Sequence, residues 1–168
     1  MNLDYMTYGS SSFILLSFLA VAVATDIHHQ RRIPNVLVSV MVGCGIVSQM
    51  IFLGAAGATL AIGGVLAGFL ILIPFYALGG MGAGDVKLLA GVGSFLGPWG
   101  VALAGVFTLA FGGVLGLAII FWQRIGMVLA ARFLSIPPSA AIDIRAAKIP
   151  YSLAITAGTL AALYWPWA

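Results

Sequence analysis

Residues 79–100 read GGMGAGDVKLLAGVGSFLGPWG, and the topology of the chain depends on how the apolar part of this stretch is placed. That part, residues 86–97, would extend about 18 Å as an α-helix, whereas the hydrocarbon core of a bilayer is ~30 Å thick. Turn-forming pairs bound it on both sides, Gly79-Gly80 before it and Gly97-Pro98 after it. Length alone therefore leaves undecided whether the stretch crosses a membrane.

The composition of the whole chain is that of an integral membrane protein. Of its 168 residues, 62% are hydrophobic and 7% are charged, whereas about 25% are charged in a typical soluble domain. The 22 glycines suit helices that pack closely on small residues in lipid. The formal net charge of +3 then reports orientation in the membrane rather than phosphate binding. This composition excludes a soluble enzyme, a disordered segment and a nucleic-acid-binding module.

The basic residues decide the number of membrane crossings. Apolar stretches near the length of a membrane span occupy residues 9–25, 36–53, 57–78, 86–97, 100–122 and 150–167. All seven basic residues lie in the connections after the first and fifth stretches or at the start of the fourth: Arg31, Arg32, Lys87, Arg124, Arg132, Arg145 and Lys148. Six crossings place all seven on one side, as the positive-inside tendency requires. The sequence therefore predicts an all-α protein with six transmembrane helices, extracytoplasmic N- and C-termini, and one membrane-embedded domain over residues 1–168.

The connection over residues 123–149 is the longest polar segment, and two interpretations of it stay open. Residues 124–134 could form a short helix that lies in the membrane interface with its basic side chains near the lipid head groups. Alternatively, the whole segment is a solvated connector between the fifth and sixth spans.

Two of the four aspartates lie where a membrane makes charge costly, which suggests a function. Asp26 ends the first apolar stretch and Asp85 begins the fourth, so the predicted topology places both at the cytoplasmic boundary. Structural alternatives are an ion pair of Asp26 with Arg31 or Arg32 and an N-cap role for Asp85. The other two, Asp4 and Asp143, lie in polar segments and are expected to be solvated.

The glycines before Asp85 are more numerous than an N-cap requires. Four of them lie in residues 79–84, and glycine lets another chain approach the backbone closely. Gly82 and Gly84 are therefore candidate substrate-binding or supporting residues. A phosphate-binding loop would end in Lys-Ser/Thr, whereas here Gly84 is followed by Asp85, which would repel phosphate.

These segments resemble the type IV prepilin peptidase family. Gly82-Ala83-Gly84-Asp85 matches the GxGD signature of that family, with Lys87 following it, and Asp26 followed by residues 31–35 (RRIPN) resembles the family's other aspartate segment. Residues 148–155 (KIPYSLAI) resemble the start of its last helix, so the resemblance covers the whole chain. A bare GxGD would be less specific, because other intramembrane aspartyl proteases such as the presenilin-like group share it.

The resemblance implies an aspartic endopeptidase with Asp26 and Asp85 as its catalytic pair. Such an enzyme removes the basic leader of prepilins or pseudopilins at the cytoplasmic face of the bacterial inner membrane. The expected partners are that substrate, the lipid bilayer and the pilus assembly machinery, with no nucleic acid and no cofactor. Large bifunctional members carry a cytoplasmic segment with paired cysteines for methyl transfer. This chain has only Cys44 and resembles the short, peptidase-only branch of tight-adherence (Flp) pilus systems, so no methyl transfer is expected.

The expected mechanism uses two carboxylates that share one proton, because like charges ~3 Å apart do not both ionise readily. The position of Asp85 at a helix start favours its ionised form and leaves Asp26 as the proton holder. Lys87 is expected either to support an aspartate or substrate backbone or to extend toward the surface.

Two alternatives to aspartic peptidase chemistry are a metal site at the neighbouring histidines and a membrane transporter. His28 and His29 adjoin Asp26, but adjacent histidines do not readily share one metal and catalytic zinc usually takes three protein ligands, so no metal site is expected. The alternative function is a small proton-coupled transporter or channel component, whose carboxylates would lie near the bilayer midplane.

Overall fold

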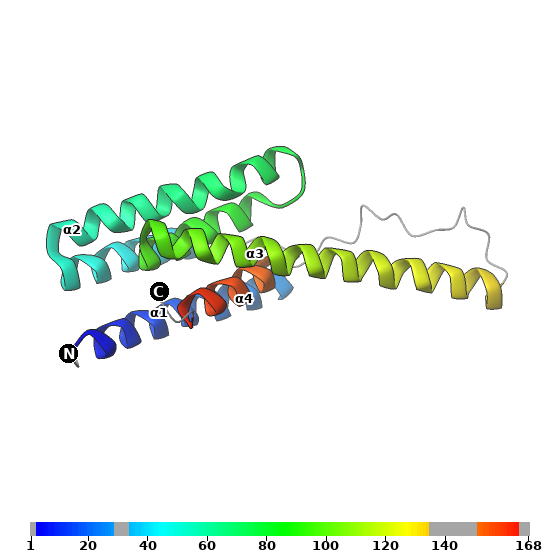
Figure 1. The fold of residues 1–168 in the computed structure, drawn as a ribbon, viewed down its shortest axis with the longest axis horizontal. Helices are drawn as coiled ribbons and strands as arrows, with labels where there is room; N and C mark the ends of the chain where they lie inside the picture. The colour runs from blue at the N-terminus through cyan, green and yellow to red at the C-terminus, as the bar shows by residue number, and fades with distance from the viewer. Residues whose placement is uncertain (1–2, 29–33, 135–150, 165–168) are drawn as a thin grey trace.

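The computed structural model describes residues 3–28, 34–134 and 151–164 (Figure 1). Within these ranges the backbone forms four helices and no strand: α1 (Leu3–His28), α2 (Asn35–Ala77), α3 (Ala83–Leu134) and α4 (Tyr151–Leu163). The prediction of an all-helical protein is therefore confirmed over the part of the chain that the structure describes.

Helices α2 and α3 each fold back on themselves at a glycine with positive φ. Gly54 has φ 61° and ψ −142°, and Gly97 has φ 70° and ψ −178°, a conformation that residues with a side chain rarely adopt. Each helix therefore consists of two arms, residues 35–53 and 55–77 in α2 and residues 83–96 and 98–134 in α3. Figure 1 shows α2 as a hairpin that turns at its label. With α1 and α4, the described residues form six helical segments at the positions of the six predicted apolar stretches.

The first arm of α3 is the centre of the bundle. Every residue from 88 to 95 is buried, including Leu88, Leu89 and Val92. A helix that is apolar on all sides belongs inside a bundle. Because other helices surround this arm, its length of about 21 Å need not match the thickness of a bilayer, which accounts for the shortness of the fourth apolar stretch.

Glycines bring the second arm of α2 into backbone contact with the first arm of α3. A Cβ atom added at Gly64 or Gly93 would overlap the carbonyl group of the other residue, and one added at Gly68 would lie 2.6 Å from the carbonyl oxygen of Leu89. Small residues allow this close approach between helices in membranes. This contact holds the first arm of α3, which carries Asp85 in its first turn, against α2.

The second arm of α3 is longer than the sequence analysis predicted. The connection was expected to begin at residue 123, but the helix continues without a break to Leu134, so a separate interfacial helix over residues 124–134 is wrong. Residues 123–134 (QRIGMVLAARFL) are mostly good helix formers, and their polarity alone does not end a helix. The arm is about 55 Å long, and Figure 1 shows it extending past the other helices. The rest of the predicted connection, residues 135–149, lies outside the described residues.

Most of the large side chains on the surface are apolar. Phe13, Leu70 and Leu117 are each more than 60% exposed, and the helix over Asn35–Ala77 and the part of α3 over Ala83–Trp122 are long and apolar enough to cross a membrane. Shorter apolar helices cover Ser11–Asp26 and Tyr151–Leu163. Such a surface suits a surrounding of lipid rather than of water.

Candidate active site

Asp26 lies near the C-terminal end of α1 and is buried, with 6% of its surface exposed. Its Oδ2 accepts a hydrogen bond of 2.5 Å from Oγ of Ser152, in the first turn of α4. Ser152 is also fully buried. The end of α1 is thus connected to the beginning of α4 through a side-chain contact between residues 126 positions apart.

Asp85 lies in the first turn of α3 and fastens the glycine-rich turn before it. Its Oδ2 accepts a hydrogen bond of 3.0 Å from the backbone N–H of Gly82, and its own N–H donates to the Gly82 carbonyl at 3.1 Å. A side chain that reaches back to the backbone N–H three residues earlier is one half of a capping box. The N-cap alternative for Asp85 is thus replaced by this related role, in which Gly82 is the cap residue. The role of Gly82 as a substrate-binding or supporting residue stays a prediction.

The turn itself is built from backbone hydrogen bonds. The N–H groups of Gly79 and Gly80 donate to the carbonyls of Tyr76 and Phe75, each at 2.9 Å, and Gly79 has φ +75°. Gly82 and its neighbour Ala83 are exposed, whereas Gly84 is half-buried. The turn therefore presents bare backbone next to the Asp85 carboxylate.

Asp26 and Asp85 lie at the same end of the bundle, because the end of α1 and the beginning of α3 are both at that end (Figure 1). They come from helices that are far apart in the sequence, and the ends of these helices meet at one end of the bundle. That this end of the bundle faces the cytoplasm stays a prediction. Two carboxylates next to exposed backbone suit acid–base chemistry on a bound peptide, in which one group is ionised and the other holds a proton.

Lys87 lies at the same end of the bundle, and its ammonium group contacts α2. Its Nζ donates a hydrogen bond of 2.9 Å to Oδ1 of Asn35, the first residue of that helix, and both side chains are exposed. Lys87 thus connects the beginnings of α2 and α3 through an exposed contact. Its support of an aspartate stays a prediction.

Two contributors to this site, Ser152 and Asn35, were quoted in the sequence analysis only as parts of longer segments. A serine or an asparagine at a helix start is ordinarily a capping residue, so neither carried a specific signal. Their partners are known only once the helices are placed beside one another.

The other predicted features of this region are less completely described. His28 is the last residue of α1, whereas His29, Arg31 and Arg32 lie outside the described residues, as does Asp143. Among the side chains that the structure describes, no group of three or more His, Cys, Asp and Glu could hold a metal ion.

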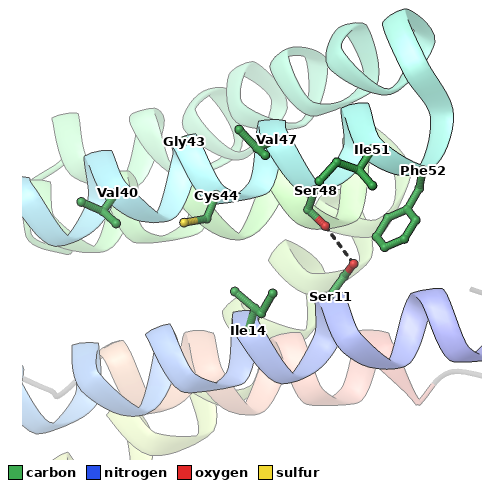
Figure 2. A pocket seen from close by; sticks show the side chains of 9 residues that line it. All are labelled: Ser11, Ile14, Val40, Gly43, Cys44, Val47, Ser48, Ile51 and Phe52. Atoms are coloured by element: carbon green, nitrogen blue, oxygen red, sulfur yellow. Dashed lines mark hydrogen bonds between the residues drawn. The ribbon is translucent and has the colours of Figure 1, made fainter.

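A cleft of about 490 Å³ lies between α1 and α2, apart from the aspartates (Figure 2). Ser11 and Ile14 line it from α1, and seven residues of α2 complete it. Ser11 and Ser48 share a hydrogen bond of 2.9 Å across it, and half-buried Cys44 is in its wall. Its lining is otherwise mostly apolar, so it offers no acid–base chemistry of its own.

Comparison with known proteins identifies one family. A family model described as the type IV leader peptidase family matches residues 13–121, which include Asp26, Asp85, Gly82, Gly84 and Lys87. The matched range is more than half of the chain and ends before α4. No curated protein and no solved structure matches the chain.

Proposed function

Since the chain belongs to the type IV leader peptidase family, we propose that it is an aspartic endopeptidase that removes the leader of prepilins or pseudopilins with Asp26 and Asp85. The observation that carries the proposal is the placement of these two carboxylates, which α1 and α3 bring to the same end of the bundle (Figure 1). A buried aspartate next to a second one is costly for stability, and peptide hydrolysis is a use that accounts for both.

The proposed reaction divides acid and base work between the two carboxylates. The ionised aspartate removes a proton from water, which attacks the carbonyl carbon of the scissile bond, while the protonated aspartate donates to the carbonyl oxygen. Collapse of the tetrahedral intermediate then transfers a proton to the leaving amine. Each general acid or base contributes typically ~10²–10⁴-fold to such a rate.

The substrate fits the exposed turn over residues 79–84. An extended peptide backbone approaches glycine more closely than any other residue, and Gly82 and Ala83 are exposed beside Asp85. The substrate's apolar helix would stay in the bilayer while its leader is cleaved at the interface. A prepilin or pseudopilin, with a basic leader before an apolar helix, has this form, and the pilus assembly machinery would be the wider partner.

We place the protein in the bacterial inner membrane with six crossings, both termini outside and the aspartates at the cytoplasmic face. The six helical segments support this topology, as does the positive-inside distribution of the seven basic residues. The C-terminal end of α1 and the beginnings of α2, α3 and α4 would then all lie at the cytoplasmic face of the membrane. The position of the aspartates at helix ends also disfavours the transporter alternative, which expects carboxylates near the bilayer midplane.

The test is cleavage by the purified protein in lipid vesicles that contain a prepilin. Mass spectrometry of the product should show loss of the leader and a mature chain that begins at a single position. Uncleaved prepilin together with proton flux across the vesicle membrane would instead support the transporter alternative. Uncleaved prepilin without such flux would contradict the proposed peptidase.

A further inference from the structure

The hydrogen bond between Ser152 and Asp26 is not used by the proposed mechanism. Its 2.5 Å length is in the range of hydrogen bonds from a hydroxyl to an ionised carboxylate, about 2.5–2.7 Å. Both side chains are withdrawn from solvent, with exposed fractions of 0% for Ser152 and 6% for Asp26. Water therefore competes little with this bond.

Ser152 differs from the other buried hydroxyl residues that the structure describes. Ser94, Thr108 and Thr159 each donate to a backbone carbonyl three or four residues earlier in their own helix. Their hydroxyl groups are satisfied locally and reach no charged group. Ser152 instead donates to a carboxylate on another helix, from the first turn of α4.

Asp85 has a weaker hydrogen-bond donor. The Gly82 N–H lies 3.0 Å from its Oδ2, and because Gly82 is exposed and Asp85 only half-buried, water competes for this bond more than for the one from Ser152. A hydrogen bond to the charged form of a carboxyl group favours that form, and a hydrogen bond is stronger in a buried site than in water. By hydrogen bonding alone, Ser152 therefore stabilises a negative charge on Asp26 more than Gly82 stabilises one on Asp85.

We propose that Ser152 is a positioning residue that holds Asp26 in its ionised form and so makes Asp26 the general base and Asp85 the proton donor. This inference rests on the two-aspartate mechanism proposed above, and it reverses the roles that the sequence analysis expected. Asp26 takes a proton from the attacking water as the new C–O bond forms, and Asp85 donates its proton to the carbonyl oxygen. When the C–N bond breaks, Asp26 gives its proton to the leaving nitrogen and Asp85 recovers one from the intermediate, so both groups return to their initial states.

The test compares Ser152→Ala, Ser152→Thr and the control Ser94→Ala in detergent with a prepilin substrate. Loss of a hydrogen bond to a charged group should lower kcat of Ser152→Ala by about 10–100-fold at neutral pH, with KM nearly unchanged. The acidic limb of its pH profile of kcat/KM should move to higher pH, so that raising the pH recovers part of the activity. Ser152→Thr keeps the hydroxyl and should restore the wild-type profile, and Ser94→Ala should leave the profile unchanged.

If the pH profile of kcat/KM for Ser152→Ala has its acidic limb at the same pH as that of the wild type, the inference is overturned, even if the variant is slower at every pH. Thermal unfolding of each variant identifies any that fail to fold, and if Ser152→Thr is one of them, the comparison of Ser152→Ala with Ser94→Ala decides. Failure of the proposed function looks different, because the wild type itself would then leave prepilin uncleaved. In that case infrared titration of the carboxyl C=O band in substrate-free protein still decides, since the inference requires the band to titrate at higher pH in Ser152→Ala.

Discussion

Replacement of Gly68 by alanine should push the second arm of α2 away from the first arm of α3 and slow cleavage. The new Cβ would lie 2.6 Å from the carbonyl oxygen of Leu89, whereas ordinary contact begins at 3.4 Å, so the two backbones must separate by about 0.8 Å. Overpacking of this kind costs typically about 1–3 kcal/mol. Leu89 is about one helical turn after Asp85, so the shift also displaces that carboxylate relative to Asp26. A displacement of 1 Å can lower the rate of a reaction by about 10²-fold.

Gly43→Ala is the matched control for this experiment. It lies in the same helix, and a Cβ there would meet nothing within 4 Å. Both substitutions gain the same helix propensity, up to about 1 kcal/mol, so the difference between the two variants measures the packing cost alone. Thermal unfolding in detergent should give a lower Tm for Gly68→Ala, and single-turnover cleavage should be slower. Equal Tm values and equal rates for the two variants would refute the close backbone contact between α2 and α3.

Three further predictions concern the fold, the chemistry and the topology. Gly97→Ala should destabilise the protein by about 1–3 kcal/mol, because its backbone conformation (φ 70°, ψ −178°) is essentially restricted to glycine. Thermal unfolding against Gly113→Ala, where a Cβ meets nothing within 4 Å, measures this cost, and equal stability would contradict it. Chelators should leave cleavage unchanged, because the proposed chemistry uses carboxylates alone, and a loss of turnover that zinc restores would contradict the mechanism. On a Cys44→Ser background, a cysteine introduced at Ala140 should resist membrane-impermeant reagents in intact cells, and labelling from outside would contradict six crossings.

The positions of the helices could be predicted from local sequence features. The Gly97-Pro98 and Gly79-Gly80 pairs lie at turns between helical segments, because glycine there adopts positive φ and proline suits a helix start. The placement of Asp26 and Asp85 at the same end of the bundle (Figure 1) could be expected from the charge distribution. A chain that reverses direction at each connection brings the end of the first helix and the beginning of the fourth to the same side.

The contacts within the site could not be predicted in the same way. Ser152 meets Asp26, and Lys87 meets Asn35, only because of how each helix is rotated and tilted against its neighbours. These angles depend on close packing against α3, such as that of Gly68 in α2 and Gly158 in α4, rather than on any local pattern. The extension of α3 to Leu134 was missed for a different reason, since polar residues with good helix propensity resemble a connector in hydropathy alone.

The most direct test of the account is turnover of a purified prepilin by the Asp26→Asn and Asp85→Asn variants in detergent, with Asp4→Asn as the control. Each catalytic variant should accumulate in the membrane like the wild type but lose about 10²–10⁴-fold in rate, and the double variant should be little worse than either single one, because the two groups act as a unit. Asp4→Asn should cleave at the wild-type rate. Near-wild-type turnover by either Asp26→Asn or Asp85→Asn would contradict the two-aspartate mechanism.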